Sequence, residues 1–236
     1  MKRKINTINK LLAEHFGIPP RSKKLPNPLD LLIATILSQN TNDKNSYKAF
    51  KNLKEKYKKW EDVARLTQTS IEKLIKVAGL GKQKSSSIKN LLSGLLKRDG
   101  KISLNHIKKL NDVEILDELT SYNGIGIKTA SCVLLFSLDR NICPVDTHVH
   151  RTLNRVGLVN TSSPEKTFYN LNGNIPPKTA HQFHTNLIRL GREICKAQKP
   201  GCSICPLQKK CTFPDKNLEK GTSSKENSFM LLDSIK

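Results

Sequence analysis

Four cysteines near the end of the chain constrain its fold more than any other feature. They have the spacing C-x6-C-x2-C-x5-C and fall within 17 residues, at Cys195, Cys202, Cys205 and Cys211. Four thiolates so close in sequence can wrap around a single metal centre. Four lysines and no acidic residue lie between the first and the last cysteine. Because nearby positive charge favours the thiolate form, this composition supports metal binding.

The spacing alone leaves the identity of that centre open. Four cysteines in a tetrahedron form a structural zinc site, but zinc sites usually pair two short knuckles and only one, at 202–205, is present. An iron–sulfur cluster is an equal alternative, and a disulfide pair is the third. Cys132 and Cys143 lie outside the motif, and Cys132 falls on an apolar segment where a core position is expected.

The charge balance indicates a polyanionic partner. Lys plus Arg number 41 against 20 for Asp plus Glu, which gives a net charge of +21. An excess of this size is typical of nucleic-acid binding. The alternative is a basic surface without a partner, with its lysines simply solvated.

No segment predicts membrane insertion or secretion. The longest strongly apolar stretch without a charge, 129–138, is about half of a membrane-spanning helix. The first ten residues are polar, and no apolar signal-peptide region follows them. We therefore expect a cytosolic protein, in which cysteines bind metal or stay as thiols more often than they form disulfides.

The apolar pattern predicts helices throughout. Alternation at period two is not sustained anywhere, which makes the expected fold class all-α. Two apolar helices, at about 113–121 and 127–138, flank the sequence Asn123-Gly124-Ile125-Gly126. Such a hairpin can turn its amides and the following helix N-terminus toward a phosphate. An ordinary turn between two helices is the alternative.

Lys128 and Asp146 form a candidate catalytic pair. Lys128 falls in the first turn of the second hairpin helix, where the helix dipole disfavours a cation. This unfavourable placement suggests a functional role for Lys128. An ordinary lysine is neutral only about once in two thousand at pH 7, and a nucleophilic amine needs a larger neutral fraction. Asp146, 18 residues further on, precedes another helix. It is a good N-cap, which is also its simplest interpretation.

Taken together, these motifs resemble a known family. The run from Asn123 to Arg151, followed by the four-cysteine loop, is similar to endonuclease III, of the helix-hairpin-helix, Gly/Pro-Asp superfamily of DNA repair glycosylases. Segment 29–39 resembles the first barrel helix of that family, and 77–80 with Lys84 resembles its wedge loop. The likeness covers about 29–211. The sequence departs from the family at Tyr122, where Tyr-Asn-Gly replaces the usual Leu-Pro-Gly.

The resemblance implies roles for the chemical groups. It implies that the Lys128 amine attacks the sugar C1′ and forms a Schiff base. It implies that Asp146 activates the amine and stabilises an oxocarbenium-like transition state. It also implies that the four cysteines hold a structural [4Fe–4S] cluster, and that the amides of Gly124 and Gly126 bind phosphate near the lesion.

Further residues are implied to contact DNA. The target nucleotide must leave the stacked duplex, which costs a few kcal/mol, and side chains must fill the gap. Leu80 is the expected wedge, although a buried contact at a helix end is the alternative for it. Gln39 or Asn40 is the expected plug. In the cluster loop, the DNA contacts expected are those of Lys196 and Lys199.

The implied fold is a two-domain helix-hairpin-helix DNA glycosylase. A helical barrel domain is expected over 24–142, an iron–sulfur cluster domain over 1–23 with 143–212, and a flexible tail over 213–236. The expected partner is double-stranded DNA with a damaged base or an abasic site, bound by a monomer. A cytoplasmic, nucleoid-associated prokaryotic protein is expected.

The implied activity is that of a bifunctional glycosylase and abasic-site lyase of base excision repair. Such an enzyme removes oxidised pyrimidines and cleaves 3′ to the abasic site by β-elimination. One alternative is a mismatch-specific thymine or uracil glycosylase of the same superfamily. Another is a non-catalytic helix-hairpin-helix DNA-binding module, in which the hairpin and the metal loop are only architecture.

Overall fold

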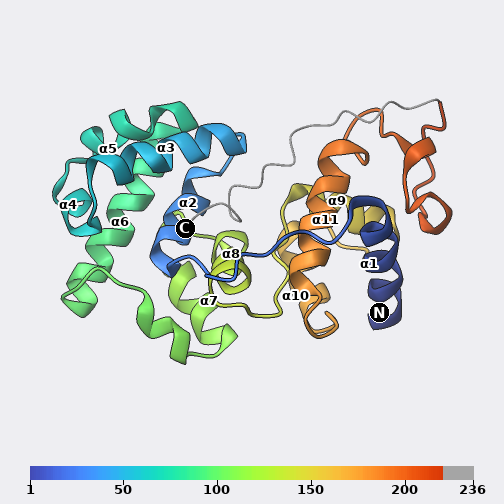
Figure 1. The fold of residues 1–236 in the computed structure, drawn as a ribbon, viewed down its shortest axis with the longest axis horizontal. Helices are drawn as coiled ribbons and strands as arrows, with labels where there is room; N and C mark the ends of the chain where they lie inside the picture. The colour runs from blue at the N-terminus through green and yellow to red at the C-terminus, as the bar shows by residue number, and fades with distance from the viewer. Residues whose placement is uncertain (220–236) are drawn as a thin grey trace. The chain divides into compact units, whose positions relative to one another are not determined.

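The computed structural model describes residues 1–219, and these residues contain helices and no strand. The all-α fold class predicted from the periodicity is therefore confirmed. The chain divides into two compact units (Figure 1). The central unit is Ser22–Arg140, and the terminal unit joins Met1–Arg21 to the chain from Asn141 onward. The boundaries expected from the sequence lie at 23/24 and 142/143. None of the described helices is both long enough and apolar enough to cross a membrane.

The central unit contains seven α-helices and two 3₁₀ turns. Their bounds are α2 Pro28–Leu37, α3 Asp43–Lys56, α4 Trp60–Arg65, α5 Gln68–Ile75, η1 Lys76–Ala78, α6 Gly81–Asp99, η2 Asn105–Lys109, α7 Asp112–Thr120 and α8 Ile127–Ser137. Two largely buried helices, α2 and α8, pack against each other and form its core. The remaining helices surround this pair: α3 and α6 pack on α2, and α7 packs on α8.

Local signals explain where the core helices begin. The side chain of Asn27 caps α2 by accepting from the amide of Leu29 at 2.9 Å, and Pro28 occupies the first turn, where its missing N–H costs nothing. Helix α7 begins with a capping box between Asn111 and Glu114. The starts of α2 and α7 are thus each defined by a short sequence motif.

Within residues 1–21 and 141–219, the terminal unit is built from four α-helices and the cysteine loop. Their bounds are α1 Lys2–Phe16, α9 Thr147–Arg155, α10 Pro164–Asn172 and α11 Ala180–Glu193, followed by η3 Cys202–Ile204 and η4 Gln208–Lys210. Helix α11 is the centre of this unit, because both α1 and α9 pack against it (Figure 1). The side-chain amide of Asn186 donates to the carbonyl oxygen of Gly17 at 3.0 Å and ties the N-terminal helix to α11.

The expected tail, 213–236, is only partly described. Residues 220–236 lie outside the described part of the chain. Residues 213–219 lie against the cysteine loop: the amide of Cys202 donates to the carbonyl of Asn217 at 3.1 Å, and the Ser203 hydroxyl donates to the carbonyl of Glu219 at 2.8 Å. This stretch therefore packs as an extension of the loop, because the loop's own backbone groups need partners.

Candidate functional site

The hairpin between α7 and α8 is closed by backbone contacts that require glycine. The amide of Ile125 donates to the carbonyl of Tyr122 at 3.1 Å, which forms the turn. Gly124 has φ +88. A Cβ added to Gly124 would collide with the Ser87 side chain, because it would lie 2.9 Å from the Cβ of Ser87. Gly126 is the N-cap of α8 and accepts from Thr129 and Ala130. The predicted hairpin between two helices is thus present.

The hairpin amides remain available for a ligand. In the described part of the chain, neither the N–H of Gly124 nor that of Gly126 has a protein partner. The first N–H groups of α8 have no partner within the helix. They therefore form, with the positive end of the helix dipole, a site suited to an anion.

Lys128 lies in the first turn of α8, directly after this turn. Its side chain is half-buried. Within the described residues of the central unit, its ammonium forms no ion pair with a carboxylate, and its carbonyl accepts from the Ser131 hydroxyl at 3.0 Å. The helix dipole opposes a cation at this position. The Lys128 side chain therefore contributes no ion pair to the described part of this unit.

Gln39 and Asn40, the two expected plug residues, have different environments. The side-chain amide of Gln39 donates to the Thr129 hydroxyl at 3.3 Å and approaches the carbonyl of Gly124 at 3.5 Å. Gln39 thus holds the end of α2 against the hairpin. Asn40 is exposed and has φ +49, a backbone conformation that asparagine tolerates better than most residues.

Leu80 projects from a tight turn in front of α6. Its side chain is 48% exposed and its φ is +49, so the alternative of a buried contact at a helix end is wrong. A groove of about 760 Å³ runs beside this turn and is lined by Leu80, Ser87, Asn123 and Gly124, among others. The structure therefore places the expected wedge and the hairpin along one groove of the central unit.

Lys84 supports the same turn from inside. The residue is completely buried, and its ammonium donates to the carbonyl oxygens of Leu37 and Ala78, each at 2.8 Å. These carbonyls belong to the last turn of α2 and to η1. Burial lowers the pKa of Lys84 to about 8. One side chain thus fixes the chain just before Gln39 and just before Leu80.

Asp146 belongs to the terminal unit, where it caps α9. Its Oδ1 accepts from the amide of Val149 at 2.9 Å, which is the N-cap role expected from the sequence. In the described part of the chain Oδ2 accepts no hydrogen bond, and the residue is half-exposed. The cap therefore orients the carboxylate and leaves one oxygen for other chemistry.

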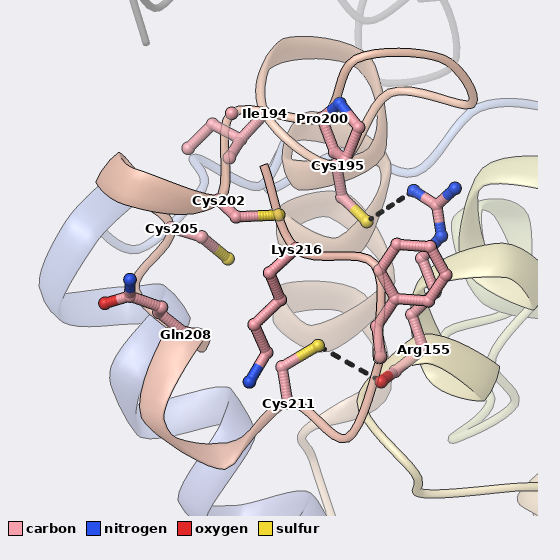
Figure 2. Close-up of a pocket in the computed structure, with 11 residues that line it drawn as sticks. Arg155, Ile194, Cys195, Pro200, Cys202, Cys205, Gln208, Cys211 and Lys216 are labelled. Atoms are coloured by element: carbon pink, nitrogen blue, oxygen red, sulfur yellow. Dashed lines mark hydrogen bonds between the residues drawn. The ribbon is translucent and has the colours of Figure 1, made fainter. Parts of the chain in front are cut away.

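The four cysteines line one pocket of the terminal unit, and their sulfur atoms surround the same space (Figure 2). All six cysteines of the chain are free, so the disulfide alternative is wrong. In residues 1–219, no three Cys, His, Asp or Glu side chains converge closely enough to hold a single metal ion. Burial raises the pKa of the Cys205 thiol to about 11, so thiolate at this position requires a nearby positive centre.

Two arginines of α9 that were not expected as site residues hold the cysteine loop. Arg151 donates to the carbonyl of Cys195 from Nε at 3.0 Å and from Nη2 at 2.9 Å. Arg155 donates to the carbonyl of Lys196 at 2.7 Å. The only sequence signal for them is their spacing of four, which puts both on one face of α9.

Lys196 and Lys199 lie between the first and second cysteines. Lys196 is half-buried, and Lys199 is exposed with φ +46. The structure gathers these two lysines with the four cysteines in the terminal unit. It gathers Gly124, Gly126, Lys128, Gln39, Asn40 and Leu80 in the central unit.

Comparison with known proteins identifies the family of this chain. The family model of the HhH-GPD superfamily base excision DNA repair proteins matches residues 33–177. A putative DNA glycosylase of Arabidopsis thaliana is 37% identical over 79% of this chain, which spans 63% of the plant protein's length. Endonuclease III of Thermotoga maritima is 35% identical over 87% of this chain and 92% of its own.

Solved structures give the same result. The structure of a non-covalent endonuclease III–DNA complex has a TM-score of 0.75 and 30% identity, and covers 90% of this chain and 95% of its own. A thermostable thymine-DNA glycosylase has a TM-score of 0.70 at 24% identity, which shows the shared fold alone. The resemblance expected from the sequence is thereby confirmed. The chain is a base excision repair DNA glycosylase of the HhH-GPD superfamily.

Proposed function

We propose that this glycosylase is bifunctional: it removes oxidised pyrimidines from double-stranded DNA and then cleaves the strand 3′ to the abasic site. The observation that carries the proposal is the position of Lys128, a lysine without a carboxylate partner in its unit, in the first turn after the hairpin. A monofunctional glycosylase activates water and needs no amine at this position.

In the proposed reaction, the neutral amine of Lys128 attacks C1′ of the flipped nucleotide. The bond between C1′ and the base breaks, and the base leaves with the bonding electron pair and takes up a proton. Asp146 takes up the ammonium proton and gives it to the departing base, and its restored carboxylate stabilises positive charge on the sugar ring. The bond from C1′ to the ring oxygen then breaks, the oxygen takes up a proton, and C1′ and the lysine nitrogen form the Schiff base. The Schiff base makes a C2′ proton acidic, and its loss breaks the C3′–O bond and expels the 3′ phosphate by β-elimination.

DNA binding rests on the groove of the central unit and on the basic loop of the terminal unit. The free amides of Gly124 and Gly126 bind a phosphate of the lesion strand. Leu80 enters the base stack, and Asn40 fills the gap, since Gln39 already serves the hairpin. Lys196 and Lys199 contact the DNA backbone. One monomer binds one duplex.

We further propose that Cys195, Cys202, Cys205 and Cys211 hold a [4Fe–4S] cluster. Sulfur atoms spread around a shared pocket fit a cluster with several irons better than one zinc ion, which needs four sulfurs at about 2.3 Å from a single point. When bound, the cluster supplies a rigid, positively charged iron centre for the thiolates. It thereby fixes the loop that carries Lys196 and Lys199.

The two units correspond, in this proposal, to the barrel domain expected over 24–142 and the cluster domain expected over 1–23 with 143–212. The mismatch-specific glycosylase remains the competing function. Its fold is shared, as the thymine-DNA glycosylase structure indicates, but it does not require the Schiff base.

Borohydride trapping tests the proposal. Wild type, Lys128→Ala and a control, Lys97→Ala, are incubated with duplexes that carry an oxidised pyrimidine, a thymine or uracil mismatch, or an abasic site. Lys97 is an exposed lysine near the end of α6. We expect a covalent adduct with wild type and the control on the oxidised pyrimidine and the abasic site, and none with Lys128→Ala.

Two outcomes would contradict the proposal. Base release without any adduct, from wild-type protein that retains its iron, would mean a monofunctional enzyme. An adduct formed on the mismatch but not on the oxidised pyrimidine would keep Lys128 as the nucleophile and assign the mismatch substrate instead.

A further inference from the structure

The side chain of Arg155 donates a hydrogen bond to a cysteine sulfur of the loop. It ends α9, and its guanidinium reaches into the cysteine pocket (Figure 2). Nη1 donates to Sγ of Cys195 at 3.5 Å and to the carbonyl of Lys196 at 2.7 Å. Nη2 donates to the carbonyl of Ala197 at 3.0 Å. The guanidinium therefore has little freedom to turn away from the sulfur.

The flat face of the same guanidinium is covered. The ring of Phe213 lies over it, with the guanidinium carbon 4.3 Å from the ring centroid. A cation stacked on an aromatic ring is stabilised and loses contact with water on that side. The ring shields the guanidinium charge from solvent on that face, and weaker screening strengthens its attraction to the sulfur.

The backbone of Arg155 holds the other end of the cysteine motif. Its carbonyl oxygen accepts from Sγ of Cys211 and from the amide of Thr212, both at 3.1 Å (Figure 2). The first and last cysteines of the motif are therefore bonded to the same residue. Together with Arg151, Arg155 connects α9 to the loop.

We propose that Arg155 raises the reduction potential of the cluster held by these cysteines. The inference rests on the proposed [4Fe–4S] cofactor. A cluster with four thiolates is anionic, and each added electron increases its negative charge. A cationic donor at one sulfur stabilises the more negative, reduced state, because hydrogen bonds to sulfur and local charge set the potential of such clusters. Phe213 acts through Arg155 by excluding water.

The test is the midpoint potential of the one-electron couple, measured on full-length holoprotein at an electrode that supplies the electron. Arg155→Met removes both the charge and the donor, and Arg155→Lys keeps the charge but loses the planar fork. Phe213→Leu removes the stack only. Lys209→Met is the matched control, because it removes an exposed positive charge from the same loop. Iron and acid-labile sulfide are measured for every variant.

We expect the potential to become more negative in the order Phe213→Leu, Arg155→Lys, Arg155→Met, and to stay at the wild-type value in Lys209→Met. Arg155→Met with about four irons per chain and the wild-type potential would overturn the proposal. If Arg155→Met loses its cluster, the result for Arg155→Lys decides. An Arg155→Lys protein that keeps a full cluster and has the wild-type potential would also overturn the proposal. Wild-type protein that contains zinc and no iron would overturn the cofactor itself, while borohydride trapping would still report on Lys128.

Discussion

The ammonium of Lys84 donates to the carbonyl oxygen of Leu37 at 2.8 Å, across 47 positions of sequence. Its second bond, to the carbonyl of Ala78, has the same length. Both carbonyls lie shortly before residues that are expected to enter the DNA. Gln39 and Asn40 follow Leu37, and Leu80 follows Ala78. The two expected insertion points are therefore held by one buried amine.

Lys84→Met should destabilise the central unit in a pH-dependent way. The substitution leaves two buried carbonyls without partners, at about 1–3 kcal/mol each. Burial lowers the pKa of Lys84 to about 8 from 10.5 in the unfolded chain, so the unfolded state binds more protons between these values. The free energy of unfolding of wild type, relative to Lys84→Met, should therefore rise by up to about 3 kcal/mol from pH 8 to pH 10.5. Urea titrations across this range measure it, and a flat difference would contradict it.

Gly124→Ala should destabilise the hairpin, whereas Gly126→Ala should not. A Cβ at Gly124 meets Ser87 and forces a side-chain residue to φ +88, at a cost of about 1–3 kcal/mol. A Cβ at Gly126 has no neighbour within 4 Å. Thermal unfolding measures the Tm of each variant, and Gly126→Ala is the control for Gly124→Ala because the two positions are only two residues apart. Equal shifts in Tm would refute the role assigned to the backbone of Gly124.

Asp146→Ala and Asp146→Asn should separate capping from catalysis. The alanine variant loses the bond to the amide of Val149 and should lose about 1 kcal/mol of stability, while asparagine caps nearly as well. Neither variant has the negative charge, so both should lose base excision. Urea midpoints and single-turnover excision rates report the two effects independently. An active Asp146→Asn enzyme would show that the residue is only a cap.

Leu80→Ala should impair excision without affecting the fold. The side chain is 48% exposed, so its truncation should change the free energy of unfolding by less than about 0.5 kcal/mol. If Leu80 stabilises the flipped state, excision from a duplex should slow markedly. Cleavage at an abasic site in single-stranded DNA, where no stack is opened, should continue at the wild-type rate. Equal losses on both substrates would argue against a wedge.

Lys199→Met should reduce the salt dependence of DNA binding. Each phosphate contact contributes about 0.9 to the slope of log K against log salt concentration. Lys199 is exposed in the cysteine loop, so its loss should lower the slope by about one contact. Lys97→Met, which removes the same charge from α6, is the control. A slope unchanged in Lys199→Met would remove this residue from the interface.

Much of the molecule follows from its local sequence. The helix at α2, the hairpin and the cap at Asp146 are each specified by residues a few positions apart, through caps, glycines and apolar periodicity. The resemblance to endonuclease III depends on the same short motifs. Local capping and periodicity act within one or two turns, so the sequence alone determined where these elements begin and end.

Other features were decided only by tertiary packing. The sequence could not distinguish Gln39 from Asn40, because the difference is a bond from Gln39 to Thr129, 90 positions away. It offered no reason to select Arg155, whose partners begin 40 residues later. Contacts of this range depend on which helix faces meet, and no short pattern encodes that. The sequence by itself thus determined the fold class and the motifs, while the tertiary structure decided which side chains are engaged and which remain free to act.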